Sequence, residues 1–431
     1  MKIKNLLVLA VAAMMFFLSS CSGMDFGIEA LILPPKLTNE QSELYTALET
    51  AAGTENLRLR YPKSGYNNSA FSFYDIDNDG HKEAIVFYSI QDETDTRINI
   101  LKNAGNKWIS VYDARGKEEV VVSVEFAEFT EGKTSIVIGW QNTISGNNIF
   151  TVYGFAGNTL SEEFSTSYEA SAVCDLTGDG CDDAVIFSSI DESGETSIRL
   201  VSSQGDELRV ISEEKLSIGA AEYLSVKNGS AAGIENALYV DYKIADESYS
   251  TDILYFENNK LKSLFALKGE ELPIRYEALL SEDIDNDGVI EIPYQTAMEG
   301  AQTEEEEITY LTTYYEASKL SIYPKFTAVI NIRDGYMYKL SADWVDSVVL
   351  IKSSYDNEWS FCELLDNNIV GMELLRIRTV NKNTYHDKFD ETYRLIAEKG
   401  VNQYYIFVPS TESELQKTFV ECKNNFSVID K

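Results

Sequence analysis

Residues 70–90 read AFSFYDIDNDGHKEAIVFYSI, which is an apolar run, an acidic turn and a second apolar run. The same scheme returns as EASAVCDLTGDGCDDAVIFSSI at 169–190 and as EALLSEDIDNDGVIEIPY at 277–294. Alternating apolar residues on both sides of a tight turn predict two paired β-strands. Three such copies in one chain indicate a repeat architecture built mainly of strands.

Two weaker copies lie between these three. Residues 124–140 and 223–242 keep both strand-like runs but lack the acids of the turn. Two further strand-like runs follow the first turn, at 97–101 and 108–112, and comparable pairs occur in the next two repeats. The turn glycines recur at intervals of about fifty residues. They are Gly80, Gly132, Gly180, Gly229 and Gly288.

Four short strands per repeat are typical of propeller blades, because one such sheet is too small to bury its own faces. We therefore predict a mainly β fold, with a β-propeller of about five or more four-stranded blades at 54–334. A set of tandem β-sandwiches with the same hairpins is the alternative.

Helical segments are predicted at both ends of the propeller. A helix at 38–53 precedes it, since Thr38 and Gln41 form a capping box and Gly53 ends the apolar face. A small α+β domain is predicted at 335–431. Its strand-like runs precede a helix at 386–399, and a last helix is expected to begin at Thr411 with Glu414 as its capping partner.

The acidic turns place oxygen atoms at the spacing that a hard cation needs. Ca²⁺ takes six to eight oxygen ligands, and alternate acids on a tight turn direct several carboxylates at one centre. The glycine permits the sharp reversal, and the residue after it would contribute its backbone carbonyl. The predicted ligands are Asp75, Asp77, Asp79, His81 and Glu83 in the first turn, Asp175, Thr177, Asp179, Cys181 and Asp183 in the middle turn, and Asp283, Asp285, Asp287, Val289 and Glu291 in the last turn.

The three turns differ from an EF-hand, because the twelfth position lacks a glutamate and both flanks are strand-like. In the middle turn Thr177 replaces one carboxylate with a hydroxyl, so we expect the lowest calcium affinity there. Acidic turns that are simply solvated, without a metal, are the alternative.

The turns resemble the calcium loops of FG-GAP and VCBS-type repeats, the integrin-α-like propeller family. The resemblance extends over residues 68–330 and is specific at the three acidic turns. It implies structural Ca²⁺ ions that rigidify the blade turns, on the side of the ring away from the binding surface.

The N-terminus is predicted to be an export signal at 1–20, in which Lys2 and Lys4 precede an apolar run too short to span a bilayer. The following Leu18–Cys21 resembles the bacterial lipobox. This resemblance implies cleavage after Ser20, lipidation of Cys21 and a tether at 21–37. An ordinary export signal is the alternative.

We therefore expect a lipid bilayer as a partner through acylated Cys21, with the chain on the extracytoplasmic face of the cell membrane. The layout is similar to that of uncharacterised lipoproteins of anaerobic Gram-positive bacteria. Disulfides are permitted in such an exported chain. The candidate pairs are Cys174 with Cys181 and Cys362 with Cys422, and free or buried thiols are the alternative.

The composition argues against several classes of function. The chain has 70 Asp and Glu against 36 Lys and Arg, a formal net charge of −34, so no nucleic acid is expected as a partner. Only two histidines are present, and the G-x-S-x-G and H-E-x-x-H motifs are absent, which argues against an enzyme with a histidine mechanism. We expect a calcium-stabilised binding or scaffold module for an unknown extracellular protein or glycan. The alternatives are a carboxylate-dependent extracellular polysaccharide hydrolase and an accessory subunit of a membrane transport or envelope-assembly complex.

Overall fold

A computed structural model describes residues 39–429 apart from 92, 106, 206, 218, 266–271, 301–307, 354–356 and 384–391. The predicted signal peptide, the tether and Cys21 lie outside these described residues. The helix expected at 38–53 is confirmed as α3 (Asn39–Ala52). No described helix combines the length and the apolar character needed to cross a membrane.

The chain is mainly β, as predicted, and its described strands pair antiparallel in six sheets that follow one another along the chain. Sheet 1 contains β1 (Leu57–Leu59), β2 (Phe71–Tyr74), β3 (Glu83–Ile90), β4 (Arg97–Asn103) and β5 (Trp108–Arg115). Sheet 2 contains β6 (Val120–Thr130), β7 (Lys133–Gln141), β8 (Asn148–Ala156) and β9 (Thr159–Tyr168). Sheet 3 contains β10 (Ala170–Cys174), β11 (Asp183–Phe187), β12 (Ser197–Gln204) and β13 (Glu207–Lys215).

The other three sheets are formed by strands between residues 222 and 428. Sheet 4 contains β14 (Glu222–Ala231), β15 (Ile234–Lys243), β16 (Tyr249–Glu257) and β17 (Lys260–Ser263). Sheet 5 contains β18 (Glu291–Ala297), β19 (Tyr310–Ala317), β20 (Ile322–Asn331), β21 (Tyr336–Lys339) and β27 (Phe426–Val428). Sheet 6 contains β22 (Val348–Ser353), β23 (Glu358–Leu365), β24 (Ile369–Asn381), β25 (Arg394–Lys399) and β26 (Asn402–Phe407).

Consecutive sheets pack face to face and share their cores. Between sheets 1 and 2, Phe87 meets Trp140 edge-on with ring centroids 6.1 Å apart, and both rings are buried. Equivalent apolar clusters join sheets 2 and 3, sheets 3 and 4, sheets 4 and 5, and sheets 5 and 6. Leu44 and Leu48 of α3 bury the outer face of sheet 1. Each sheet thus gains the burial that its own few strands cannot provide.

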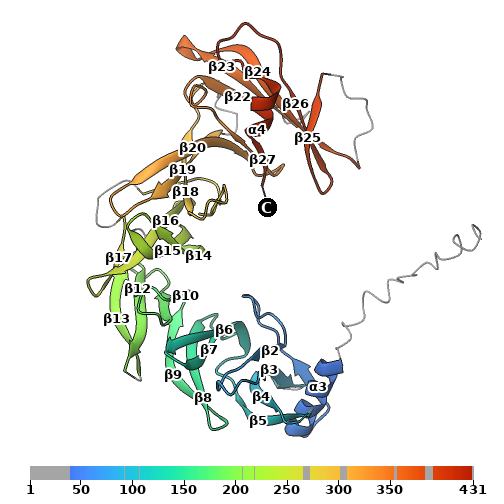
Figure 1. Ribbon diagram of the computed structural model, residues 1–431, viewed down its shortest axis with the longest axis vertical. Coiled ribbons are helices and arrows are strands. Elements are labelled where there is room, and N and C mark those ends of the chain that lie inside the picture. The colour runs from blue at the N-terminus through green and yellow to red at the C-terminus, as the bar shows by residue number, and fades with distance from the viewer. Residues whose placement is uncertain are drawn as a thin grey trace, which may run out of the picture.

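The six sheets form a curved arc (Figure 1). The first strands β6, β10 and β14 lie on its inner side, whereas β9, β13 and β17 lie toward the outside. The two ends of the arc do not meet, so the ring of the predicted propeller is not closed in this structure.

The first and last described strands each pair at their own end of the arc. The N-terminal β1 pairs with β3 of its own sheet, with Leu57 opposite Ile90. The C-terminal β27 pairs with β21, with Val428 opposite Tyr336. Neither terminal strand therefore bridges sheet 1 to the far end of the arc.

The predicted α+β domain at 335–431 needs correction. Strand β21 belongs to sheet 5 although it lies beyond the predicted boundary at residue 334, and the following segment is a five-stranded sheet with one short α-helix, α4 (Phe419–Asn424), and a 3₁₀ turn, η1 (Asp366–Asn368). Residues 394–399 of the expected helix form β25 instead, whereas 386–391 lie outside the described residues. Tertiary pairing with β26 outweighs the helical spacing of the apolar residues in this segment.

Two turn positions were also misread. The last helix begins after Thr418, whose capping box with Glu421 repeats the T-x-x-E pattern found at Thr411, so the sequence offered two equivalent start signals. In sheet 4 the hairpin turns at Gly233, which has a φ of +83°, and Gly229 lies within β14. A Cβ atom at Gly229 would come within 2.7 Å of Ile290 Cδ1, so close packing against the next repeat explains that glycine.

A buried ion pair fastens the connection between sheets 4 and 5. The guanidinium of Arg275 lies 2.8 Å from Asp241 Oδ1 of β15, and both side chains are 0% exposed. Arg275 also donates to the Thr251 hydroxyl and to the Leu279 carbonyl, while Asp241 accepts from the backbone N–H of Ser281. These bonds hold the chain that leads into the last acidic turn.

We expect Asp241→Asn to lower the free energy of unfolding by about 3–5 kcal/mol, because it leaves the buried charge of Arg275 without its counterion. Asp95→Asn is the matched control, since the pair of Asp95 with Arg115 is largely exposed and contributes about 1 kcal/mol or less. Urea unfolding followed by tryptophan fluorescence measures both. Equal midpoints for the two variants would contradict the proposed role of the buried pair.

Candidate cation-binding turns and inner groove

The three acidic turns share one hydrogen-bond frame. Both carboxylate oxygens of Asp75 accept backbone N–H groups, from Asp79 at 3.0 Å and from Gly80 at 2.9 Å. The corresponding first acids, Asp175 and Asp283, accept from the equivalent backbone groups. The first acid of each turn therefore stabilises the turn itself, with or without a cation.

The acids at the fifth and ninth positions also make the same hydrogen bonds in all three turns. Asp79 accepts the backbone N–H of His81 at 2.8 Å, and Asp179 and Asp287 likewise accept those of Cys181 and Val289. The ninth acids are Glu83, Asp183 and Glu291, and each accepts the N–H of the residue after the first acid. The glycines Gly80, Gly180 and Gly288 have φ near +90°, which only glycine adopts readily. The predicted spacing thus corresponds to one local structure.

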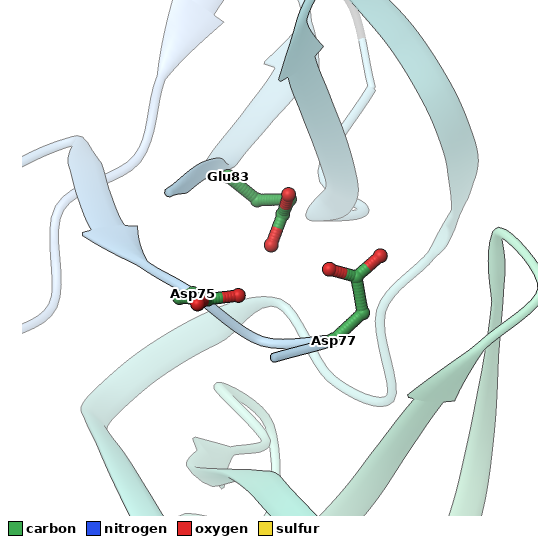
Figure 2. A group of neighbouring side chains, drawn as sticks. All are labelled: Asp75, Asp77 and Glu83. Carbon is green, nitrogen blue, oxygen red and sulfur yellow. The ribbon is translucent and has the colours of Figure 1, made fainter. Parts of the chain in front are cut away.

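Carboxylates converge in two of the turns. Oxygens of Asp75, Asp77 and Glu83 lie within 4.8 Å of one another, and Figure 2 shows the three side chains pointing toward a common centre. Asp283, Asp285 and Glu291 form the same group in the last turn. Both clusters could hold a cation, because their oxygens are the hard ligands that such ions prefer.

A lysine reaches into the first cluster. The ammonium of Lys102, on β4, is bonded to Asp77 and lies 3.7 Å from Glu83 Oε1 and 3.6 Å from Asp79 Oδ2. Burial raises the pKa of the Glu83 carboxyl, whereas Asp77 and the nearby acids outweigh the burial of Lys102 and raise the pKa of its ammonium. The ammonium supplies positive charge where the sequence predicted a metal.

The last turn shows the same arrangement with a lysine from another strand. Lys325 Nζ, on β20, lies 3.0 Å from Asp285, 2.5 Å from Asp287, 2.8 Å from Glu291 and 3.0 Å from Glu316. Glu316, opposite Glu291 in the β18–β19 register, was not predicted as a site residue. The hydrogen bond from Lys325 is the main cause of the lowered pKa of Asp287.

The middle turn differs, because no ion pair of a described lysine or arginine reaches Asp175, Asp179 or Asp183. Asp183 is 0% exposed, and burial raises the pKa of its carboxyl. Its Oδ1 atom and the Thr177 hydroxyl are both buried, and neither makes a hydrogen bond of ordinary geometry to a described residue. Two oxygen ligands are therefore in place here without a neighbouring cation.

The two lysines at the turns were not predicted, because they come from other strands. Nothing near Asp75 or Asp283 in the sequence signals Lys102 or Lys325, since only the register of β3 with β4 and of β19 with β20 brings them to the turns. The fourth position was also missed, where Asn78 bonds the carbonyl of Gly132 in sheet 2 at 2.7 Å.

The described cysteines are free thiols. Cys174 is the last residue of β10 and Cys181 lies in the middle turn, and both are half-buried. Cys362 on β23 and Cys422 in α4 are buried. The structure therefore shows neither of the two pairings that were offered as candidates.

A groove of about 920 Å³ runs along the inner side of the arc. Its wall is formed by one strand from each of four successive sheets, with Tyr74 from β2, Phe126 from β6, Ser171–Val173 from β10 and Val226–Asn228 from β14. The approach to the last acidic turn, including Glu282 and Asp283, completes it. A second hollow of about 530 Å³ adjoins it and shares Glu125.

The groove contains aromatic and carboxylate side chains. Tyr74 and Phe126 stack with ring centroids 4.3 Å apart, and Tyr66 is fully exposed beside them. Glu125 reaches solvent, but the surrounding strands desolvate its carboxyl and raise its pKa. Within the described part of the chain, its carboxylate has no hydrogen-bond or ion-pair partner.

Comparisons with known proteins give no family. No protein-family model and no curated protein matches the chain. Among solved structures, it is similar to the rhamnogalacturonan lyase YesW, with 11% identity and a TM-score of 0.36 over 73% of this chain and 62% of that one. It is also similar to the exotype rhamnogalacturonan lyase YesX, with 12% identity and a TM-score of 0.28 over 64% of this chain and 56% of that one.

A third similar structure is a putative 6-phosphogluconolactonase from Bacteroides fragilis, with 8% identity and a TM-score of 0.29 over 74% of this chain and 93% of that one. The chain spans less than two thirds of the length of either lyase. At these scores the similarities carry no argument about activity.

Proposed function

We propose that the protein is a surface-anchored binding module, in which propeller-type sheets present the inner groove to an extracellular ligand. One observation carries this proposal: the groove is lined by β2, β6, β10 and β14 and by the segment that leads into β18, so sheets 1 to 5 contribute to a single concave surface. Concave surfaces of stacked repeats are suited to binding extended ligands. The stacked Tyr74 and Phe126 supply a rigid apolar platform within it.

A photo-crosslinking amino acid at Tyr66 tests the groove on intact cells. We expect discrete adducts from position 66, because that side chain is exposed at the groove wall. The matched control is Val210 on β13, which is exposed on the outer side of the arc. Identical adduct patterns from both positions would contradict a binding role for the inner groove.

The second part of the proposal is a Ca²⁺ site in the middle turn. Here Thr177 and Asp183 offer buried oxygens without a competing lysine, whereas Lys102 and Lys325 neutralise the other two turns, whose carboxylates lie closer together. We propose that Ca²⁺ occupies the middle turn with the highest affinity. This order is the reverse of the one expected from the number of carboxylates alone.

Calorimetric calcium titration with melting curves tests this order. We expect one site in the native protein with a Kd of about 10⁻⁵–10⁻³ M, lost in Asp179→Asn. We expect Lys325→Met to add a second site and to make the melting temperature depend on calcium, because four carboxylates then face one another without a counterion. Lys339→Met, on β21 of the same sheet, is the control. A native protein that already binds calcium at all three turns, with no gain in Lys325→Met, would refute the proposed competition.

The anchor is the third part of the proposal, and its support is the lipobox-like Leu18–Cys21 after an apolar run. Lipidation of Cys21 would hold the sheets at the extracytoplasmic face of the membrane. We expect Cys21→Ser to move the protein from the membrane fraction to the soluble fraction, with Cys174→Ser unchanged. Mass spectrometry of the mature N-terminus should show an acylated Cys21, and an unmodified residue there would reject the anchor.

A further inference from the structure

The charge of the groove indicates what kind of ligand it binds. Its described lining includes three carboxylates, Glu125, Glu282 and Asp283, against one lysine, Lys227. The ammonium of Lys227 is already bonded to the backbone carbonyl of Ser281 at 2.9 Å. Glu169 adds a further acid in the adjoining hollow. A polyanionic ligand would therefore be repelled, and a cationic one attracted.

Glu125 is the carboxylate that both hollows share. Its side chain is exposed to solvent there, and its carboxylate has no partner among the described residues. An unpaired carboxylate gains most from a ligand that brings both a positive charge and a hydrogen-bond donor. The ring of Tyr66 and the face of Tyr74 that does not stack on Phe126 also line the groove and are suited to the same group, since ammonium and guanidinium ions bind over aromatic rings.

The backbone of the groove favours a polypeptide over a small polyamine. Strand β10 occupies the edge of sheet 3, where its described pairing is with β11 alone, and Ser171–Val173 of β10 line the groove. An edge strand presents backbone N–H and C=O groups that an extended chain can pair with. The edge of β6 is different, because the segment at 63–67 already bonds to it through the carbonyls of Val121, Val122 and Val124.

We infer that the inner groove binds an extended, lysine- or arginine-bearing segment of another polypeptide, with Glu125 as its central ionic contact and β10 as its backbone partner. This inference rests on the proposed function of the groove as a ligand-binding surface. It names the ligand class that the carboxylates, aromatic faces and free strand edge have in common.

The test uses the purified protein and fluorescence anisotropy of a labelled peptide of alternating lysine and serine. We expect saturable binding that weakens as salt is raised, and about tenfold weaker binding to Glu125→Gln. Glu213→Gln, on β13 of the outer side, is the matched control and should bind like the native protein. The comparison ligands are a peptide of alternating glutamate and serine, spermine and a neutral xylan fragment.

The outcomes separate the two proposals. Equal affinity of Glu125→Gln and native protein for the basic peptide would overturn the inference, as would spermine competing as well as the peptide does. Binding of the xylan fragment alone, lost in Tyr74→Ala, would also overturn it but would leave the groove as the binding surface. If Glu125→Gln and Tyr74→Ala fold normally and change the binding of none of these ligands, the groove itself would be the wrong site.

Discussion

The structure depends on burial between neighbouring sheets. A sheet of four short strands exposes two faces, and in this chain each face is covered by the next repeat, as when Phe87 of sheet 1 meets Trp140 of sheet 2. The end faces need other partners. Helix α3 covers sheet 1, and sheet 6 shares the core of sheet 5 through residues such as Tyr338 and Phe361. The stability of each repeat is therefore linked to that of its neighbours.

The acidic turns show how one local frame can serve different counterions. The first and ninth acids of each turn are used for backbone hydrogen bonds, so the turn forms without a metal. The remaining oxygens repel one another unless a positive charge lies among them. In the first and last turns a lysine provides that charge, from two different strand positions. In the middle turn the buried oxygens of Thr177 and Asp183 still lack such a partner among the described residues.

Local pattern was sufficient to predict most strands but not their long-range partners. The runs expected at 97–101 and 108–112 match β4 and β5, because alternation along a strand is visible in the sequence. The lysines at the turns were not visible, since they lie one or two strands away and depend on register. The same limitation misplaced residues 394–399, whose spacing suits a helix but whose partner is β26.

The pairing of β27 with β21 has a consequence for the order of folding. Val428 lies opposite Tyr336, so sheet 5 is incomplete until residues 426–428 are available. Sheets 1 to 4 contain only strands close together in sequence, and each can assemble soon after it emerges during synthesis or translocation. Sheet 5 therefore completes its strand pairing last, and until then the edge of β21 is open to intermolecular pairing. A chain truncated before Phe426 would expose that edge permanently, and aggregation rather than simple loss of binding would be its first defect.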